Sequence, residues 1–220
     1  MINSKGYEVV SKVFTEEEIS FLREKSFALL NSGRCFENSG GLARPDFIKD
    51  ELAVDIVDLL DSKDLASLIS KMVGEDVEFI SHNDLHLNRT VGWHKDRLNG
   101  EVNRFEEHSP WETVDGQSMK IFKCNIYLQD HTNYNDCWTV RDGSHLTEDM
   151  NVGEIKVLRP GIGDIVVFDQ RLTHRGPQSK QQDRLLICMG YGVKNIFFEE
   201  FEKGTIFRQD KQNDNIYRHW

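Results

Sequence analysis

Two residues with metal-binding side chains stand two positions apart in the stretch Gly92-Trp93-His94-Lys95-Asp96. On an extended strand, side chains at i and i+2 project from the same face, so His94 and Asp96 can address one object while Lys95 points away. An imidazole and a carboxylate are two of the three ligands of the site that holds non-heme Fe(II) and leaves coordination positions open. A bare H-x-D tripeptide also recurs by chance, and a histidine hydrogen-bonded to a neighbouring carboxylate is the alternative interpretation. The metal hypothesis therefore requires a third ligand, which we expect to be a distant histidine.

A second group of chemically capable residues lies some eighty positions downstream. His174 follows the apolar strand-like run of 164–169 and precedes a turn at Gly176-Pro177, where its side chain can be directed inward. Arg184 comes ten residues after His174 and opens the apolar run 185–189. An arginine there would be buried unless an anionic group meets it, and a carboxylate on a bound cosubstrate would serve.

The first third of the chain is expected to be helical. Thr15 and Glu18 have the spacing of a capping box, and apolar residues follow one helical face from Ile19 to about Leu30. The apolar pattern predicts two more helices, over 52–60 and from about Ser62 to Gly74. A short strand is expected within 6–14 and a loop at 34–49.

From residue 76 onward, β-branched and aromatic residues dominate and are separated by Gly, Asn, Asp and Pro. Strands are expected near 77–88, 90–94, 119–129, 137–141, 154–158, 164–169 and 184–193. Their number and spacing are typical of a sandwich or jelly roll. We expect one domain over 1–220, with a helical part (1–75) packed on one outer face, a jelly-roll core (76–193), and a C-terminal helix and tail (194–220) in which Phe197 and Phe201 pack on the domain.

Two segments left alternatives open. In 121–128, apolar residues alternate with Lys123, Asn125 and Tyr127, so this polar row faces either solvent or a ligand cavity. The segment 97–117 has no hydrophobic period and is longer than connections usually are. It is interpreted either as a lid, in which Arg97, Arg104 and Trp111 close over a substrate, or as a disordered surface insertion.

Composition excludes several classes of partner. With a net charge of −10 and no dense Lys/Arg cluster, we expect no binding to nucleic acid or to anionic membranes. No apolar run is long enough to span a bilayer. The four cysteines lack C-x-x-C spacing and follow a polar N-terminus, which predicts reduced thiols and a cytoplasmic protein.

Together, the residues His94, Asp96, Gly143-Ser144-His145, Gly163-Asp164, His174 and Arg184 resemble the pattern of the phytanoyl-CoA dioxygenase family of Fe(II)- and 2-oxoglutarate-dependent oxygenases. The similarity covers about 76–193 and implies a double-stranded β-helix, the cupin-like jelly roll that the strand count also favours. It further implies that His94, Asp96 and His174 bind Fe(II) and that Arg184 pairs with the far carboxylate of 2-oxoglutarate. Some relatives place a serine where this chain has Gly176. We expect Asn125, Tyr127 or Thr173 to replace that contact with the cosubstrate.

The resemblance implies a dioxygenase that uses O2 to hydroxylate a small or medium-sized soluble molecule while 2-oxoglutarate is converted to succinate and CO2. One alternative is a cupin-like metalloenzyme that does not use 2-oxoglutarate, and Arg184 argues against it. The other is a non-catalytic, ligand-binding jelly roll, which the intact set of ligands disfavours. The pattern specifies neither the substrate nor the oligomeric state.

Overall fold

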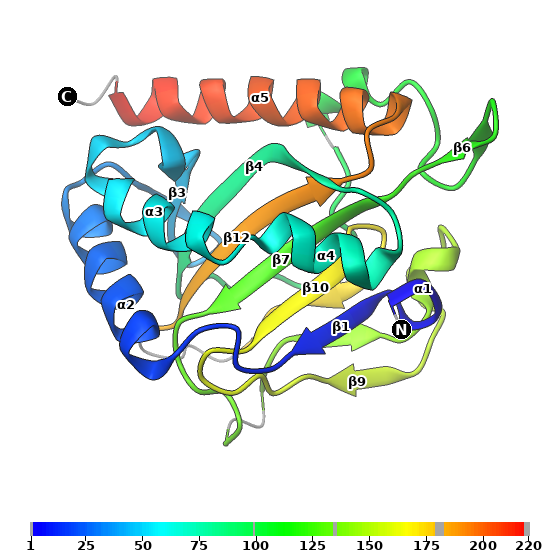
Figure 1. Cartoon of the computed structure of the whole chain (residues 1–220). Coiled ribbons are helices and arrows are strands. Elements are labelled where there is room, and N and C mark those ends of the chain that lie inside the picture. The colour runs from blue at the N-terminus through cyan, green and yellow to red at the C-terminus, as the bar shows by residue number, and fades with distance from the viewer. Residues whose placement is uncertain (1, 99, 134–135, 179–182, 218–220) are drawn as a thin grey trace.

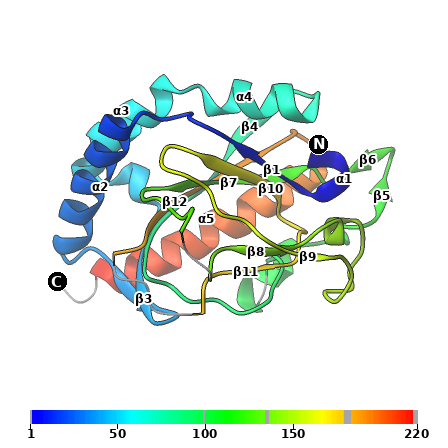
Figure 2. The ribbon, with the colours of Figure 1, turned by 90° about the horizontal axis from the view of Figure 1, so that it is seen from below.

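Two antiparallel sheets form the framework of the computed structural model, which describes residues 2–98, 100–133, 136–178 and 183–217 (Figure 1). The larger sheet has the order β1-β10-β7-β12-β4-β3-β2, and its strands are β1 (Tyr7–Val10), β2 (Phe36–Asn38), β3 (Gly41–Pro45), β4 (Glu78–Leu87), β7 (Ile121–Tyr127), β10 (Ile165–Asp169) and β12 (Leu185–Gly192). The smaller sheet has the order β11-β8-β9, from β8 (Thr139–Arg141), β9 (Ile155–Val157) and β11 (His174–Arg175). It lies beneath the larger sheet in Figure 2. The expected jelly roll is confirmed.

Three helices of the N-terminal third cover the opposite face of the larger sheet. The α-helices are α1 (Ile2–Lys5), α2 (Glu16–Asn31), α3 (Val54–Ser62), α4 (Leu65–Val73) and α5 (Ile196–Tyr217), and short 3-10 helices lie at Phe47–Lys49, Glu51–Ala53, Gly100–Phe105 and Ser144–Leu146. Apolar residues of α2, α3 and α4 form one buried core with the sheet. The capping box at the start of α2 is confirmed, because Glu18 N donates to Thr15 Oγ1 over 3.2 Å and Thr15 N donates to the Glu18 carboxylate over 2.8 Å.

The alternation along β7 separates the two faces of the larger sheet. Phe122, Cys124 and Ile126 pack into the core shared with α2 to α4. The side chains of Lys123 and Asn125 face the other way and line a cavity between the sheets, together with Tyr127. The polar row therefore faces a cavity and not solvent, which decides between the two interpretations. The neighbouring strand β10 is buried at all five positions, as its continuous apolar run predicted.

Three local expectations were wrong. The segment 34–49 is not only loop, since it contains the hairpin β2–β3, whose tight turn lies at Ser39-Gly40, both with positive φ. The segment 90–94 forms no strand, because its only β-type pairing is the single bridge between His94 and His174. In addition, α4 begins at Leu65, where the Asp64 carboxylate caps Ser67 N, rather than near Ser62.

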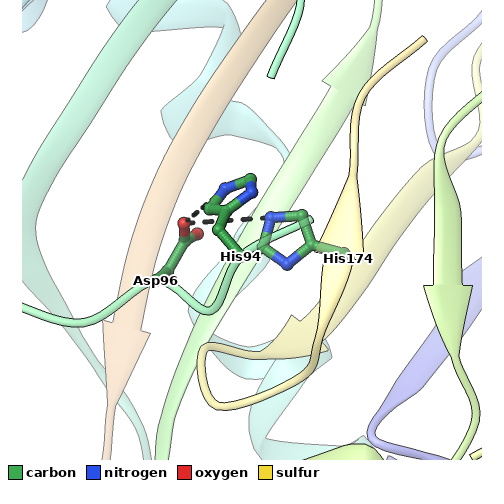
Figure 3. A group of neighbouring side chains, drawn as sticks. All are labelled: His94, Asp96 and His174. Carbon is green, nitrogen blue, oxygen red and sulfur yellow. Dashed lines mark ion pairs between the residues drawn. The ribbon is translucent and has the colours of Figure 1, made fainter. Parts of the chain in front are cut away.

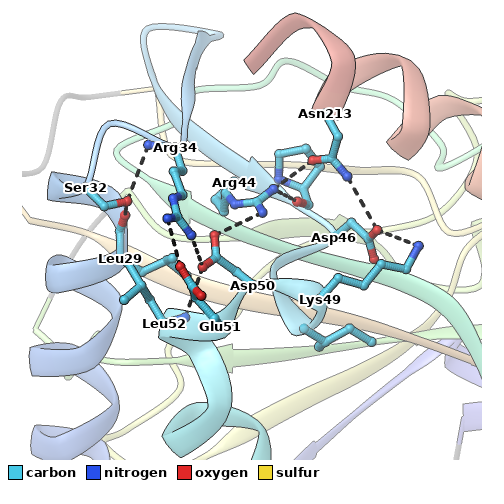
Figure 4. A network of polar contacts seen from close by, with 12 residues as sticks. Leu29, Ser32, Arg34, Arg44, Asp46, Lys49, Asp50, Glu51, Leu52 and Asn213 are labelled. Carbon is cyan, nitrogen blue, oxygen red and sulfur yellow. Dashed lines mark hydrogen bonds and ion pairs between the residues drawn. The ribbon is translucent and has the colours of Figure 1, made fainter. Parts of the chain in front are cut away.

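The C-terminal helix α5 contacts the rest of the domain near both of its ends. Near its start, Phe197 and Phe201 are buried, as predicted, in a cluster with Ile80 and Met119. Toward its end, Asn213 accepts a hydrogen bond from Arg44 of β3 over 2.8 Å and donates to Asp46 (Figure 4). A tail beyond Tyr217 lies outside the described residues.

A network of charged side chains around Arg44 holds the end of α5 on the β2–β3 hairpin. The Arg44 side chain is 1% exposed and forms an ion pair of 3.1 Å with Asp50, which also pairs with Arg34 over 2.8 Å (Figure 4). Buried charges of this kind are stable only when paired, so the network holds the β2–β3 hairpin against α5. Helix α5 thereby becomes one wall of the cavity. Within the described residues, no helix is both long and apolar enough to cross a membrane.

Candidate active site

Three side chains from distant parts of the chain meet at the cavity wall. His94 and Asp96 come from the segment after β4, and His174 begins β11 (Figure 3). Asp96 Oδ1 lies 3.3 Å from His94 Nε2 and 3.8 Å from His174 Nε2. One donor atom from each residue lies within 4.8 Å of the others, and among the described residues this is the only such group of metal-binding side chains. The structure therefore brings together the three ligands expected from the sequence.

Backbone pairing fixes the two histidines opposite one another. His94 N donates to His174 O and His174 N donates to His94 O, both over 2.9 Å. Each ring also turns its Nδ1 to a carbonyl two residues upstream, Gly92 O at 2.7 Å and Leu172 O at 2.9 Å. A carbonyl can only accept, so each Nδ1 carries a proton, and each Nε2 faces Asp96. Hydrogen bonds of this type orient histidine ligands at metal sites.

The charges of the three groups suit metal binding. Burial alone would raise the pKa of Asp96, but the adjacent His174 and His94 hold it well below its usual range. Burial, followed by the neighbouring His94, lowers the pKa of His174 to about 4. Burial also acts to lower the pKa of His94, but the hydrogen bond with Asp96 and its charge raise it above the ordinary value. Asp96 is thus an anion and His174 neutral at pH 7, as ligation requires.

Lys95 points away from this group, as the i, i+2 spacing predicted. Its Nζ donates to the carbonyls of Ser144 and Arg171, each over 2.7 Å, and these two bonds tie the segment of His94 and Asp96 to the residues that follow β8 and precede β11. The Gly143-Ser144-His145 turn contributes a second tie, because Ser144 Oγ accepts from Thr173 N over 2.8 Å beside His174. The turn therefore positions the site rather than contacting its centre.

The cavity beside the three ligands has a volume of about 330 Å³. Besides His94, Asp96 and His174, its lining includes polar side chains from β4, β7 and α5 and apolar ones such as Trp138, Phe168 and Phe201. Trp138 and Phe168 pack on the His174 ring, with centroids 5.2 and 4.9 Å away. His94, Asp96 and His174 thus share a chamber whose volume lies within the range of small-molecule sites.

Arg184 lies at the cavity, next to Tyr127. It is 6% exposed, its backbone N donates to Asn88 Oδ1 over 2.8 Å, and its Nη2 donates to Arg89 O. No carboxylate of the described residues forms an ion pair with it. Burial lowers the pKa of Arg184, although the group stays a cation. A buried guanidinium without a carboxylate partner is a receptor for an anionic ligand.

The three candidates for a replacement contact differ in position. Asn125 and Tyr127 line the cavity, and Asn125 Oδ1 is buried without a hydrogen-bond partner among the described residues. Thr173 is fully buried behind the ligands and does not line the cavity. The structure therefore brings Asn125 and Tyr127 to the site with Arg184 and leaves Thr173 outside it.

Several lining residues were not found from the sequence. His82, Asp84 and His86 alternate along β4 and face the cavity together, and Asp84 pairs with Arg208 of α5 over 3.3 Å. Polar residues at every second position of an expected strand are a period-two signal that could have indicated this row. Arg89, beside Arg184, had no comparable signal.

The segment 97–117 contributes one wall of the cavity. Its Leu98 and Arg97 line the chamber, and Arg97 is held by ion pairs with Glu106 at 3.2 Å and Glu148 at 3.0 Å. Trp111 donates to His145 O over 3.0 Å and stacks on Arg97, whereas Arg104 lies over Phe105 and Phe207. Of the three residues proposed to close over a substrate, only Arg97 lines the cavity.

Comparison with known proteins identifies the fold. No protein-family model and no curated protein sequence matches this chain. Among solved structures, AviO1 from Streptomyces viridochromogenes Tue57 superposes with a TM-score of 0.67 and 23% identity, over 87% of this chain and 91% of that one. The non-heme alpha ketoglutarate dependent epimerase SnoN from nogalamycin biosynthesis gives 0.65 and 18%, over 86% and 78%. HygX from Streptomyces hygroscopicus, with nickel and 2-oxoglutarate bound, gives 0.63 and 16%, over 88% and 85%. At these identities the likeness shows a common fold.

Proposed function

We propose that this chain is an Fe(II)- and 2-oxoglutarate-dependent oxygenase that hydroxylates a small or medium-sized soluble metabolite. One observation carries the proposal: the three convergent ligands and the unpaired Arg184 line the same cavity. Two proteins with this fold, SnoN and SnoK, are alpha ketoglutarate dependent enzymes, which supports the assignment. The narrower resemblance to the phytanoyl-CoA dioxygenase family rests on the sequence pattern alone.

The residues present fit the metal. Two neutral imidazole Nε2 atoms and one carboxylate form the donor set that suits non-heme Fe(II) and leaves positions for other ligands. His94 and His174 would hold the ion through their Nε2 atoms because their Nδ1 atoms are engaged with backbone carbonyls. Asp96 would supply the negative charge.

The cavity also fits the cosubstrate. Arg184 would bind the far carboxylate of 2-oxoglutarate, and Arg89, whose Nε is buried without a partner, lies beside it. Asn125, with its unpaired buried Oδ1, and Tyr127 would supply the hydrogen bonds that a serine at position 176 gives some relatives. Arg184 has no carboxylate partner, and Asn125 Oδ1 and Arg89 Nε have no hydrogen-bond partner, among the described residues, so these groups have unused capacity for a ligand.

When bound, Fe(II) together with 2-oxoglutarate and O2 supplies the oxidising chemistry, with succinate and CO2 as coproducts. The chain's own residues place the reactants and exclude water. Trp138 and Phe168 form the apolar wall behind His174, and Leu98 and Phe201 close the chamber on the α5 side. These walls would hold a C–H bond of the substrate near the metal.

Hydroxylation is favoured over chlorination because Asp96 occupies the position that a halide would need. The neighbours SnoN and SnoK are called an epimerase and a carbocyclase, so the same fold also serves other outcomes. We place the reaction in the cytoplasm, an assignment supported by four cysteines that form no disulfide.

The test is succinate formation from 2-oxoglutarate by the purified chain with Fe(II) and O2, measured without added substrate. Slow succinate release is expected from the wild type and none from His174→Ala. The control is Lys156→Ala, since Lys156 is exposed and pairs only with Glu154. Release that is equal in all three proteins would refute the proposal. Metal binding without any use of 2-oxoglutarate would favour a cupin-like metalloenzyme instead.

A further inference from the structure

The end of the cavity remote from Arg184 is also positively charged. Lys123 of β7 and Arg208 of α5 line it, with Thr205, His82 and Asp84 around them. The register of β12 on β7 places Gly190 opposite Lys123, and Gly190 comes six residues after Arg184. At about 3.3 Å per residue, the backbone positions of Lys123 and Arg184 lie roughly 20 Å apart along the sheet.

Lys123 is a buried cation without a counter-ion. Its residue is 2% exposed, and no hydrogen bond or ion pair joins its Nζ to any of the described residues. The Nζ lies 5.3 Å from the centre of the Phe201 ring. Lys95, also a buried lysine, shows the usual arrangement, because two backbone carbonyls accept from its Nζ. A buried ammonium is costly unless an anion meets it.

Arg208 provides a second set of donors at the same end. One of its nitrogens, Nη2, contacts Asp84 and His82 Nδ1, the latter at 3.0 Å. Its Nε is buried and has no hydrogen-bond partner among the described residues. The guanidinium therefore keeps donor capacity that the protein does not use. Thr205, 1% exposed, lies one helical turn before Arg208 on the same face of α5.

Arg184 and Lys123 serve different ends of the chamber. The groups whose charges act most on Lys123 are Cys188, Asp96, Arg208 and Asp84, whereas those that act on Arg184 include Tyr127 and Arg89. Asp96, the proposed metal ligand, lines the same cavity as Lys123. A short keto acid that reaches from Arg184 to the metal would leave Lys123 on the far side, where a substrate must lie.

The charges of the cavity support this division. Of its described lining residues, four cations (Arg89, Lys123, Arg184 and Arg208) face two carboxylates (Asp84 and Asp96) once Lys95 and Arg97, which are engaged elsewhere, are set aside. Fe(II) and 2-oxoglutarate carry equal and opposite charges, so their binding leaves this excess of positive charge unchanged. The whole chain, in contrast, carries a net charge of −10.

We propose that Lys123 and Arg208 form an anion subsite and that the substrate therefore carries a carboxylate or phosphate group bound there. That the bound anion belongs to a substrate rests on the proposed function, but the anion subsite itself does not require the metal. Lys123 binds the anion directly, and Arg208, oriented by Asp84, contributes its free donors.

The test is calorimetric titration of the full-length protein, loaded anaerobically with Fe(II) and 2-oxoglutarate, with inorganic phosphate or with propionate at constant ionic strength. Truncating one partner of a buried charge pair leaves the other charge without a counter-ion, so Lys123→Met should weaken anion binding at least about tenfold. The control is Lys120→Met, three residues earlier, whose exposed ammonium pairs with Glu75. Whichever of the two anions binds more tightly indicates whether the substrate group is a phosphate or a carboxylate.

Three results would overturn the inference. These are no anion binding by the loaded wild type, equal binding by wild type and Lys123→Met, or a loss of 2-oxoglutarate affinity in Lys123→Met as large as that in Arg184→Met. If Lys123→Met does not fold, Lys123→Gln takes its place. If the wild type fails to bind Fe(II) and 2-oxoglutarate, the proposed function fails, and the same titrations on the metal-free protein still decide whether the anion subsite exists.

Discussion

Replacing Arg184 with methionine removes the charge at the proposed cosubstrate end of the cavity while keeping a long apolar side chain. Arg184 is 6% exposed and pairs with no carboxylate of the described residues, so a bound dicarboxylate would be its counter-ion. Leaving a buried charge without its partner costs about 3–5 kcal/mol, and every ~1.4 kcal/mol corresponds to a tenfold change in affinity. Arg184→Met should therefore weaken 2-oxoglutarate binding by roughly two to three orders of magnitude.

Calorimetry with two ligands separates this effect from general damage. The wild type should bind 2-oxoglutarate far more tightly than 2-oxobutyrate, which lacks the far carboxylate, and Arg184→Met should bind the two alike. Arg175→Met is the matched control, because Arg175 pairs with Asp136 over 3.4 Å and does not line the cavity. Fe(II) affinity should change little in either variant. An unchanged preference for 2-oxoglutarate in Arg184→Met would refute the assigned pairing.

Three further predictions concern stability, pH and product. Gly190→Ala should lower the free energy of unfolding, measured in urea, by about 1–3 kcal/mol, because a Cβ there would lie 2.6 Å from Ile80 Cγ2 and 2.8 Å from His82 Cβ. An unchanged free energy of unfolding would show that β4 can shift to make room for the methyl group. The hydrogen bond to Glu200 raises the pKa of His108 above 6.5, so the stabilisation is complete below the unfolded pKa and is lost as pH rises through the folded one. The melting-temperature difference between wild type and His108→Gln should accordingly be largest below pH 6.5 and shrink as the pH rises through the raised pKa, and a pH-independent difference would contradict the ion pair. When the reaction is run under labelled O2 with excess chloride, mass spectrometry should show one labelled oxygen in the product. A chlorinated product would refute the assignment of Asp96 as a metal ligand.

The parts of the fold carried by local pattern were predictable. The capping box located the start of α2, and the alternation of Lys123 and Asn125 with apolar neighbours located a two-faced strand. The proposed ligands were found because His94 and Asp96 stand at an i, i+2 spacing and His174 follows a buried strand. These signals depend only on residues close in sequence.

Features that depend on tertiary contact were not predictable. The strand expected at 90–94 is absent because the backbone there pairs only at His94, where it meets His174. The short β2–β3 hairpin is held by Arg44 and Asp50, whose burial follows from contact with distant α5. Arg208 reaches the cavity for the same reason, since no local pattern tells which face of a terminal helix a chamber will meet. Whether 97–117 moves as a lid stays a prediction.

The most direct measurement of the central claim is the visible absorption spectrum of the protein with Fe(II) and 2-oxoglutarate in the absence of O2. A keto acid that chelates Fe(II) through its carboxylate and keto oxygens gives a weak charge-transfer band, so the wild type should develop this band. His94→Ala and His174→Ala, which each remove one of the Nε2 ligands, should not. A band of the same intensity in either variant, or none in the wild type, would contradict the assigned iron site.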